Sequence, residues 1–118
     1  MKKIESPMFV MNRYNAALAD LRKDSEYIVI DIMRPNSLSN PFKITTEADR
    51  NAVIDKFRRH LWEDMKRNGP MNQELKTIIN HRLAGKSVVL VCCCKPKKCH
   101  GDIIKSACDY LIQQRRKP

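Results

Sequence analysis

The chain has 118 residues, of which 42% are hydrophobic and 31% are charged, and its formal net charge is +10 at pH 7. This composition excludes an intrinsically disordered chain and is sufficient for one domain with a buried core. The apolar runs have the length of single strands, so they are too short to span a bilayer. The excess of positive charge favours polyanionic partners such as nucleic acid, nucleotides or other phosphorylated ligands.

The cysteines indicate a reducing compartment. There are five of them, and three are consecutive at 92–94. Neighbouring residues of a strand point in opposite directions, so consecutive cysteines cannot hold separate loops together. A disulfide framework is therefore disfavoured, and we expect reduced thiols in the cytoplasm. The N-terminal apolar stretch is too short and too interrupted for a signal peptide.

The first half of the chain predicts two strands and a long loop. A short apolar run at 8–11 predicts a strand, and residues 16–21 are weakly helical. The β-branched run YIVIDIM at 27–33 predicts a buried strand. Residues 34–44 contain two prolines, two asparagines and two serines, which favour turns. Loops of this length in compact domains often carry function.

The second half of the chain predicts three helices and one strand. The segment Thr46-Glu47-Ala48-Asp49 resembles a capping box, and Gly69-Pro70 ends the helix that this box begins. Asn72 is expected to cap the next helix. The predicted elements are a helix between Thr46 and Gly69, a helix between Asn72 and Gly85, a strand at 87–93, an amphipathic helix over 103–112 and a basic tail at about 113–118.

Strands separated by helices predict a small α/β domain of two or three layers, with a short, mostly parallel sheet flanked by helices. We expect residues 1–118 to form this single domain. In a parallel sheet the carboxyl ends of the strands share one edge, where open α/β sheets bind their ligands. The loops at 34–42 and 94–102 follow the two strong strands, so we expect them to face one another at this edge.

The segment 88–102, VVLVCCCKPKKCHGD, carries most of the reactive side chains. We expect Cys99 at the N-cap of the last helix, where backbone N–H groups and three nearby lysines lower the pKa of a thiol. His100 could act as acid or base and Asp102 could orient it, so Cys99, His100 and Asp102 are the catalytic candidates. The same features suit a phosphate bound at the helix start. Alternatively, Cys99 packs in the core and Asp102 only caps the helix.

The expected ligand-binding residues come from both loops. Arg34 and Arg50 could hold a phosphate between two guanidinium groups, although a salt bridge to Asp31 or Asp49 is the alternative. Asn40 either contacts a base edge or fixes its own loop through an Asx turn, and we favour the turn. The full set of expected ligand-binding residues is Asn12, Arg34, Asn40, Phe42, Arg50, Cys94 and Gly101.

Zinc is the rival interpretation of the cysteines. The alternation of a strand places Cys92 and Cys94 on one face and Cys93 on the other, where we expect Cys93 to be buried. Cys94 lies nearest the loop and is the functional candidate of the three. Zinc would take Cys92, Cys94, Cys99 and His100 as ligands. Their spacing is poor because no C-x-x-C pair is present, so no cofactor is expected.

Two motifs that follow the strong strands occur together in one known family: Arg34-Pro35 with Asn40-Pro41-Phe42, and Cys99-His100-Gly101-Asp102. On these motifs the chain resembles the small phage and bacterial proteins grouped as domain of unknown function 4326. The further matching positions are Asn12, Arg50, Cys92, Cys94 and Pro96. The resemblance covers roughly residues 8–112 of the chain.

The resemblance implies a compact α/β domain, an origin that is often a phage, and a site formed by the two motifs. It implies no established activity. Three positions depart from the pattern, since Met33 and Ser39 stand where Gly is usual and Cys93 stands where an aromatic residue is usual. These changes could narrow a pocket or alter its ligand.

Three hypotheses for the function follow. The leading one is a phage-encoded protein of the host cytoplasm that binds, and could process, a nucleotide or nucleic-acid-derived phosphorylated ligand at the sheet edge. The second is a non-catalytic basic module that binds nucleic acid or a host protein, with a steep dependence on salt for nucleic acid. The third is a structural zinc-binding domain. None of the three has a membrane as partner.

Overall fold

The computed structural model describes residues 7–33, 36–93, 95 and 97–116 of the chain. Arg34 and Cys94, which the sequence analysis assigns to the candidate site, therefore lie outside the described residues. In the part of the chain that is described, no helix is both long and apolar enough to cross a membrane.

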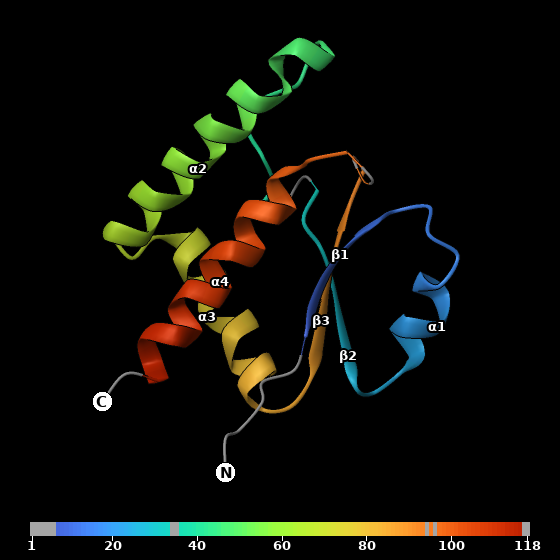
Figure 1. The fold of residues 1–118 in the computed structure, drawn as a ribbon. Coiled ribbons are helices and arrows are strands. Elements are labelled where there is room, and N and C mark those ends of the chain that lie inside the picture. The colour runs from blue at the N-terminus through green and yellow to red at the C-terminus, as the bar shows by residue number, and fades with distance from the viewer. Residues whose placement is uncertain (1–6, 34–35, 94, 96, 117–118) are drawn as a thin grey trace.

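A sheet of three parallel strands lies in the middle of the molecule (Figure 1), and its strand order is β1-β3-β2. The strands are β1 (Met8–Asn12), β2 (Tyr27–Asp31) and β3 (Ser87–Cys92). Leu90 of β3 pairs with Val10 of β1 on one side and with Ile30 of β2 on the other. Because β3 is central, its residues 88–91 are almost completely buried, as the continuous apolar run predicts.

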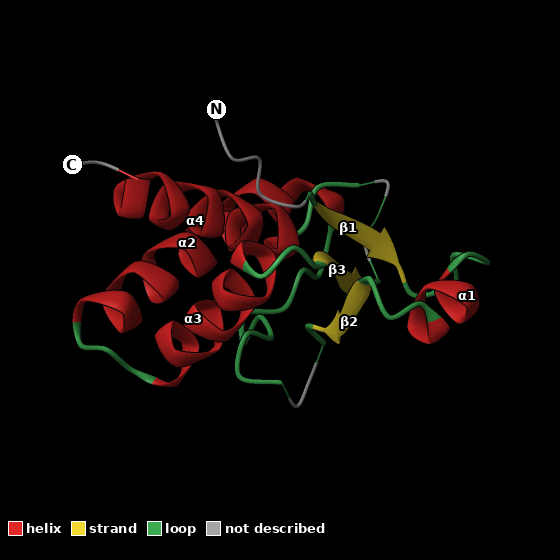
Figure 2. Cartoon of the chain, turned by 90° about the horizontal axis from the view of Figure 1, so that it is seen from below, coloured by secondary structure: helices red, strands yellow, loops and turns green. Residues whose placement is uncertain are grey.

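Three long helices cover one face of the sheet, and one short helix covers the other (Figures 1 and 2). The helices are α1 (Leu18–Lys23), α2 (Arg50–Lys66), which follows a 3-10 turn (Glu47–Asp49), α3 (Pro70–Leu83) and α4 (His100–Arg116). Leu90 and Cys92 of β3 join the core under the long helices. Val89 and Val91 face the other way and pack with Leu18 of α1. The expected small α/β domain with a parallel sheet between helices is confirmed.

Two helix boundaries differ from the sequence prediction. α3 begins at Pro70 rather than after Asn72. Backbone N–H groups in the first turn of a helix have no partner within the helix, so Pro, which has no N–H, is well tolerated there. Asn72 is therefore not the N-cap, and its backbone N–H donates a 2.7 Å hydrogen bond to the buried carboxylate of Asp64. α4 continues through most of the expected basic tail, as far as Arg116.

The start of α4 lies unusually close to the sheet, and Gly101 makes this approach possible. A Cβ atom on Gly101 would lie 2.8 Å from Cγ1 of Val10, 3.1 Å from Cδ1 of Ile32 and 3.3 Å from Sγ of Cys99. The valine cannot turn aside easily, because its branched Cβ restricts χ1. Because Gly101 has no side chain, α4 can pack closely against the sheet. The space at Gly101 is filled by the sheet rather than left for a ligand.

We expect Gly101→Ala to destabilise the protein by about 1–3 kcal/mol through overpacking. Helix propensity alone would favour Ala by about 1 kcal/mol, so any loss reports the contact with the sheet. Urea unfolding measures the change, with Ser106→Ala on an exposed part of the same helix as the matched control. The cost should shrink in a Val10→Ala background, which removes the nearest methyl group. A gain in stability of about 1 kcal/mol in Gly101→Ala, which helix propensity alone predicts, would contradict this account.

Candidate functional site

A pocket of about 420 Å³, which we call the sheet-edge pocket, lies at the carboxyl edge of the sheet. Its walls come from the end of β2 and the loop after it, from the first turn of α2, and from the region that joins β3 to α4. The lining residues are Ile32, Met33, Ser39, Asn40, Phe42, Ile44, Arg50, Cys93 and His100. The pocket thus brings together four of the expected site residues: Asn40, Phe42, Arg50 and His100.

Arg50 is held in the wall of this pocket by an ion pair and a backbone contact. Its Nε lies 2.7 Å and its Nη2 3.2 Å from the two carboxylate oxygens of Glu47, and its Nη1 donates to the Lys98 carbonyl at 2.8 Å. The salt-bridge partner is therefore Glu47 rather than Asp31 or Asp49. The Lys97 ammonium lies 3.2 Å from the same Glu47 carboxylate. Hydrogen bonds from Arg50 and Lys97 lower the pKa of Glu47, so this acid stays ionised and fixes the loop before α4.

Asn40 and Phe42 form one corner of the pocket through an Asx turn. The side-chain oxygen of Asn40 accepts the backbone N–H of Phe42 at 2.9 Å, which confirms the predicted turn. The half-buried Phe42 ring meets the His60 ring edge-on, with 5.7 Å between centroids. The Lys56 ammonium lies 6.0 Å from the Phe42 ring centroid. The turn therefore presents an aromatic ring to the pocket, with a cation beside it.

His100 is buried as a neutral imidazole of fixed tautomer. Its Nε2 lies 3.0 Å from the Ile32 carbonyl. Because a carbonyl only accepts, Nε2 carries the proton and Nδ1 holds the lone pair. Burial lowers the pKa of His100, and its ring packs edge-on against Phe57 with 5.0 Å between centroids. A ligand in the pocket therefore meets an uncharged ring that can accept a proton or a hydrogen bond.

Asp102 caps α4, and its carboxylate binds two groups of the preceding loop. One oxygen accepts the backbone N–H of Cys99 at 3.2 Å, and the other lies 2.6 Å from the Lys95 ammonium. These contacts match the capping alternative for Asp102. The His100 ring is oriented by the Ile32 carbonyl, which takes the part that the sequence analysis gave to Asp102.

Cys99 lies in the core rather than in the pocket. Its side chain is fully buried, and its Sγ lies 3.3 Å from Sγ of Cys92. The contact with the Cys92 thiol and burial raise the pKa of the Cys99 thiol far above its ordinary range. The expected lowering of this pKa is wrong, because burial and a second thiol outweigh the start of the helix. A thiolate nucleophile at Cys99 is thus disfavoured in the folded chain.

Cys93 is exposed and lines the pocket, whereas the sequence analysis expected it to be buried. The strand β3 ends at Cys92, so the alternation of faces no longer applies at the next residue. Cys93 is therefore the thiol that a ligand in the pocket would contact. In the sequence, only the end of the apolar run indicated that Cys93 is exposed. Cys94, the candidate chosen from the sequence, lies outside the described residues.

The zinc ligand set is not assembled among the described residues. No group of three or more His, Cys, Asp or Glu side chains that could hold a metal ion occurs there. Cys94 lies outside them. Cys92 and Cys99 contact each other, while Nε2 of His100 is bonded to a carbonyl.

Asn12 supports the site from outside the pocket. Its side-chain nitrogen donates to the Lys95 carbonyl at 2.7 Å, and its oxygen accepts the backbone N–H of Tyr14 at 2.8 Å. These bonds tie the end of β1 to the loop before α4. Asn12 and Gly101, both expected to bind ligand, are thus placed in the scaffold of the site.

A protein-family model described as Domain of unknown function (DUF4326) matches residues 15–110. The match spans 96 of the 118 residues and contains every residue of the sheet-edge pocket. Asn12 lies just before it. No curated protein and no solved structure matches the chain.

We expect the cysteines to react with iodoacetamide in two classes. Exposed Cys93 should be alkylated rapidly in the native protein, whereas Cys92, Cys99 and Cys108 should react only on unfolding, because all three are buried. Burial also raises the pKa of Cys108 to about 12, and thiolate is the reactive form. Peptide mapping by mass spectrometry at successive times measures each rate. Labelling of Cys99 as fast as that of Cys93 would refute the assignment.

The stability of the protein should fall with acid through His100. An unfolded histidine has a pKa of about 6.5, and burial lowers the folded pKa below this value, so the unfolded chain takes up the proton first as pH falls. Stability is therefore full above about pH 6.5 and declines as pH falls from there toward the folded pKa. Urea unfolding of His100→Gln should show a flatter dependence between about pH 7 and pH 5. The control is Ser106→Ala at an exposed position of the same helix, which removes no titratable group and should keep the wild-type slope, and an unchanged slope in His100→Gln would contradict the account.

Proposed function

The chain belongs to the DUF4326 family, and from that premise we propose that it binds a nucleotide or another nucleic-acid-derived phosphorylated ligand in the sheet-edge pocket. The family brings no established activity, so the proposal rests on the residues of this chain. The observation that carries it is the meeting of Asn40, Phe42, Arg50 and His100, from three separate segments, around one cavity at the carboxyl edge of a parallel sheet. Open α/β sheets bind ligands at this edge.

The charges around the pocket favour an anion. Arg50 lies in the wall with 14% of its side chain exposed, and Lys56 lies over Phe42. The loop before α4 adds Lys97 and Lys98, while Glu47 neutralises part of this charge. The Nε and Nη2 side of the Arg50 guanidinium holds Glu47, so Arg50 would act on a phosphate mainly through its positive charge. A phosphate would therefore be held by side-chain cations.

The start of α4 is not itself the phosphate site in this proposal. The Asp102 carboxylate already accepts the N–H of Cys99, and its negative charge would repel a phosphate placed there. The Lys95 ammonium also lies at this start, but Asp102 neutralises it across a distance of 2.6 Å. The phosphate is thus assigned to the side of the pocket formed by Arg50.

The remaining walls suit a planar, partly apolar group such as a nucleobase. Ile32, Met33 and Ile44 supply aliphatic surface, and Phe42 supplies an aromatic face. Asn40 contributes an amide, which can both donate and accept. The volume of about 420 Å³ falls in the usual range for small-molecule sites, about 300–1,000 Å³. One nucleotide therefore fits the size and the polarity of the pocket.

A reaction on this ligand would use His100. Its neutral ring, with the proton on Nε2, leaves Nδ1 as the acceptor that general-base catalysis needs. The Ile32 carbonyl supplies the orientation. Cys99 has no part in this version of the proposal, because its thiol is buried.

The alternative is non-catalytic binding of a longer nucleic acid, which the net charge of +10 favours. Such binding depends on the release of counterions and falls steeply with salt. Binding of one nucleotide in a pocket also uses base contacts, so it should keep more of its affinity as salt rises. The same titration at two salt concentrations separates the two candidates.

Asn40→Asp should weaken ligand binding and leave the fold intact. Aspartate keeps the oxygen that accepts the N–H of Phe42, but it adds a negative charge to the pocket, which should weaken an anion by on the order of tenfold or more. The matched control is Asn36→Asp. The Asn36 oxygen makes the same turn in the same loop, accepting the N–H of Leu38 at 2.7 Å, and Asn36 does not line the pocket.

Thermal unfolding with a panel of ribo- and deoxyribonucleoside mono- and triphosphates tests the proposal. A ligand at one hundred times its Kd adds about 2.7 kcal/mol of stability, which corresponds to several degrees in Tm. At least one nucleotide class should raise the Tm of the wild type and of Asn36→Asp equally, and that of Asn40→Asp by clearly less. The absence of any shift in folded wild-type protein would reject the nucleotide site.

A further inference from the structure

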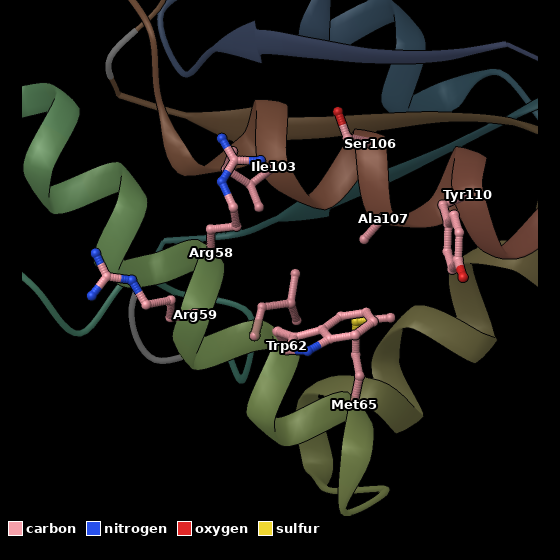
Figure 3. A pocket seen from close by; sticks show the side chains of 9 residues that line it. Arg58, Arg59, Trp62, Met65, Ile103, Ser106, Ala107 and Tyr110 are labelled. Carbon is pink, nitrogen blue, oxygen red and sulfur yellow. The ribbon is translucent and has the colours of Figure 1, made fainter.

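A second cavity, of about 440 Å³, lies between α2 and α4 and shares no residue with the sheet-edge pocket. We call it the α2–α4 groove (Figure 3). Its lining residues are Arg58, Arg59, Leu61, Trp62 and Met65 of α2 and Ile103, Ser106, Ala107 and Tyr110 of α4. None of these residues is acidic.

Large apolar side chains in the groove remain exposed to solvent. Leu61 and Ile103 are buried, but Trp62 and Tyr110 are 50% and 51% exposed. Two half-exposed aromatic rings thus border one concave surface, and apolar surface rimmed by polar residues is typical of interaction sites. Tryptophan, tyrosine and arginine are also the residues that dominate binding energy at protein interfaces.

The two ends of the groove differ in character. Figure 3 shows Trp62 and Met65 near Ala107 and Tyr110, with the two arginines toward the other end. Arg58 makes only a loose ion pair with Asp55, at 3.8 Å, and both side chains are 59% exposed. An occupant of this groove must therefore combine apolar side chains with negative charge.

We propose that the α2–α4 groove docks an acidic, amphipathic helix of a partner protein. Helices that enter such grooves present apolar side chains at positions i, i+3, i+4 and i+7. Here these side chains contact Trp62, Met65 and Tyr110, and carboxylates on the same segment pair with Arg58 and Arg59. The proposal is independent of the nucleotide site, because it uses other residues.

Other occupants fit the groove less well. A nucleic-acid strand needs cations along its whole length, whereas the cations here gather at one end of an aliphatic floor. A second copy of this chain would bring another net charge of +10 against the arginines, and like charges oppose association. A membrane surface is flat on this scale and cannot fill a concave groove. An acidic helix satisfies both the shape and the charge.

A phage-displayed library of random 16-residue peptides, selected on the full chain, provides the probe. The library is first depleted on the variant Arg58→Glu/Arg59→Glu. Enriched sequences should be acidic and should carry apolar residues at helical spacing. Trp62 is the only tryptophan of the chain, so its fluorescence reports directly whether a selected synthetic peptide enters the groove.

The selected peptide should shift Trp62 emission of the wild type to the blue and saturate. Titration calorimetry, which also serves the variant without tryptophan, should show binding at least about tenfold weaker (about 1.4 kcal/mol) to Arg58→Glu/Arg59→Glu and to Trp62→Ala. Two matched controls should bind as the wild type does. Arg22→Glu/Lys23→Glu on α1 makes the same change of net charge on the opposite face, and Tyr14→Ala removes another exposed aromatic ring. Unfolding curves verify that every variant is folded.

Several outcomes would overturn the proposal. They are a selection without enrichment, enriched peptides with no acidic bias, or equal affinity for the groove variants and the controls. A thymidine oligonucleotide or a phosphatidylglycerol vesicle that changes Trp62 fluorescence only when both arginines are present would assign the groove to another class of partner. If sedimentation shows dimers of the wild type but monomers of Trp62→Ala, the groove would be assigned to a second copy of the chain.

Discussion

The close contact between the start of α4 and the sheet determines the geometry of the sheet-edge pocket. Gly101 lets the helix approach until it lies against Val10 and Ile32, and this approach brings the His100 ring within hydrogen-bonding distance of the Ile32 carbonyl. The same contact buries Cys99 beside Cys92. A helix start even slightly farther from the sheet would free the imidazole and change its tautomer, its charge and its role.

Polar contacts around this start tie three distant parts of the chain to one another. Asp102 binds the Lys95 ammonium, and Asn12 binds the Lys95 carbonyl. The second of these contacts joins β1 to the loop before α4. Arg50 and Glu47 bind the same loop from the side of α2. Most of the charged groups near the pocket are thus paired, and these pairs fix the positions of the surrounding segments. The net charge of +10 comes from the excess of lysine and arginine together, 23 residues, over 13 acidic residues in the whole chain.

Much of the architecture could be predicted from the pattern of apolar residues, whereas the chemistry of single side chains could not. Two strong apolar runs separated by helical patterns are enough to predict a parallel sheet and the common edge at which their loops meet. The turn at Asn40 is local and was predicted for that reason. By contrast, the choice of Glu47 as partner of Arg50 depends on how a 3-10 turn enters α2. The pattern does not encode that detail.

The thiols show the same limit. Spacing indicates that Cys99 lies at a helix start, but its acidity depends on how deeply that start is buried and on what lies beside it. Cys93 was misplaced because the last residue of a strand cannot be located to within one position from an apolar run. The errors therefore concern the depth of burial and the ends of elements, while the order of the elements is correct.

The strand order has a consequence for how the chain reaches this structure. Among the described residues β1 and β2 are not neighbours, and each pairs with β3 alone, the last of these strands to be made. During synthesis the first two strands therefore remain unpaired until residue 92 has left the ribosome. Non-local pairing of this kind slows folding and exposes strand edges to other chains. The central strand is thus deeply buried in the finished protein, and the pairing of both other strands depends on its arrival.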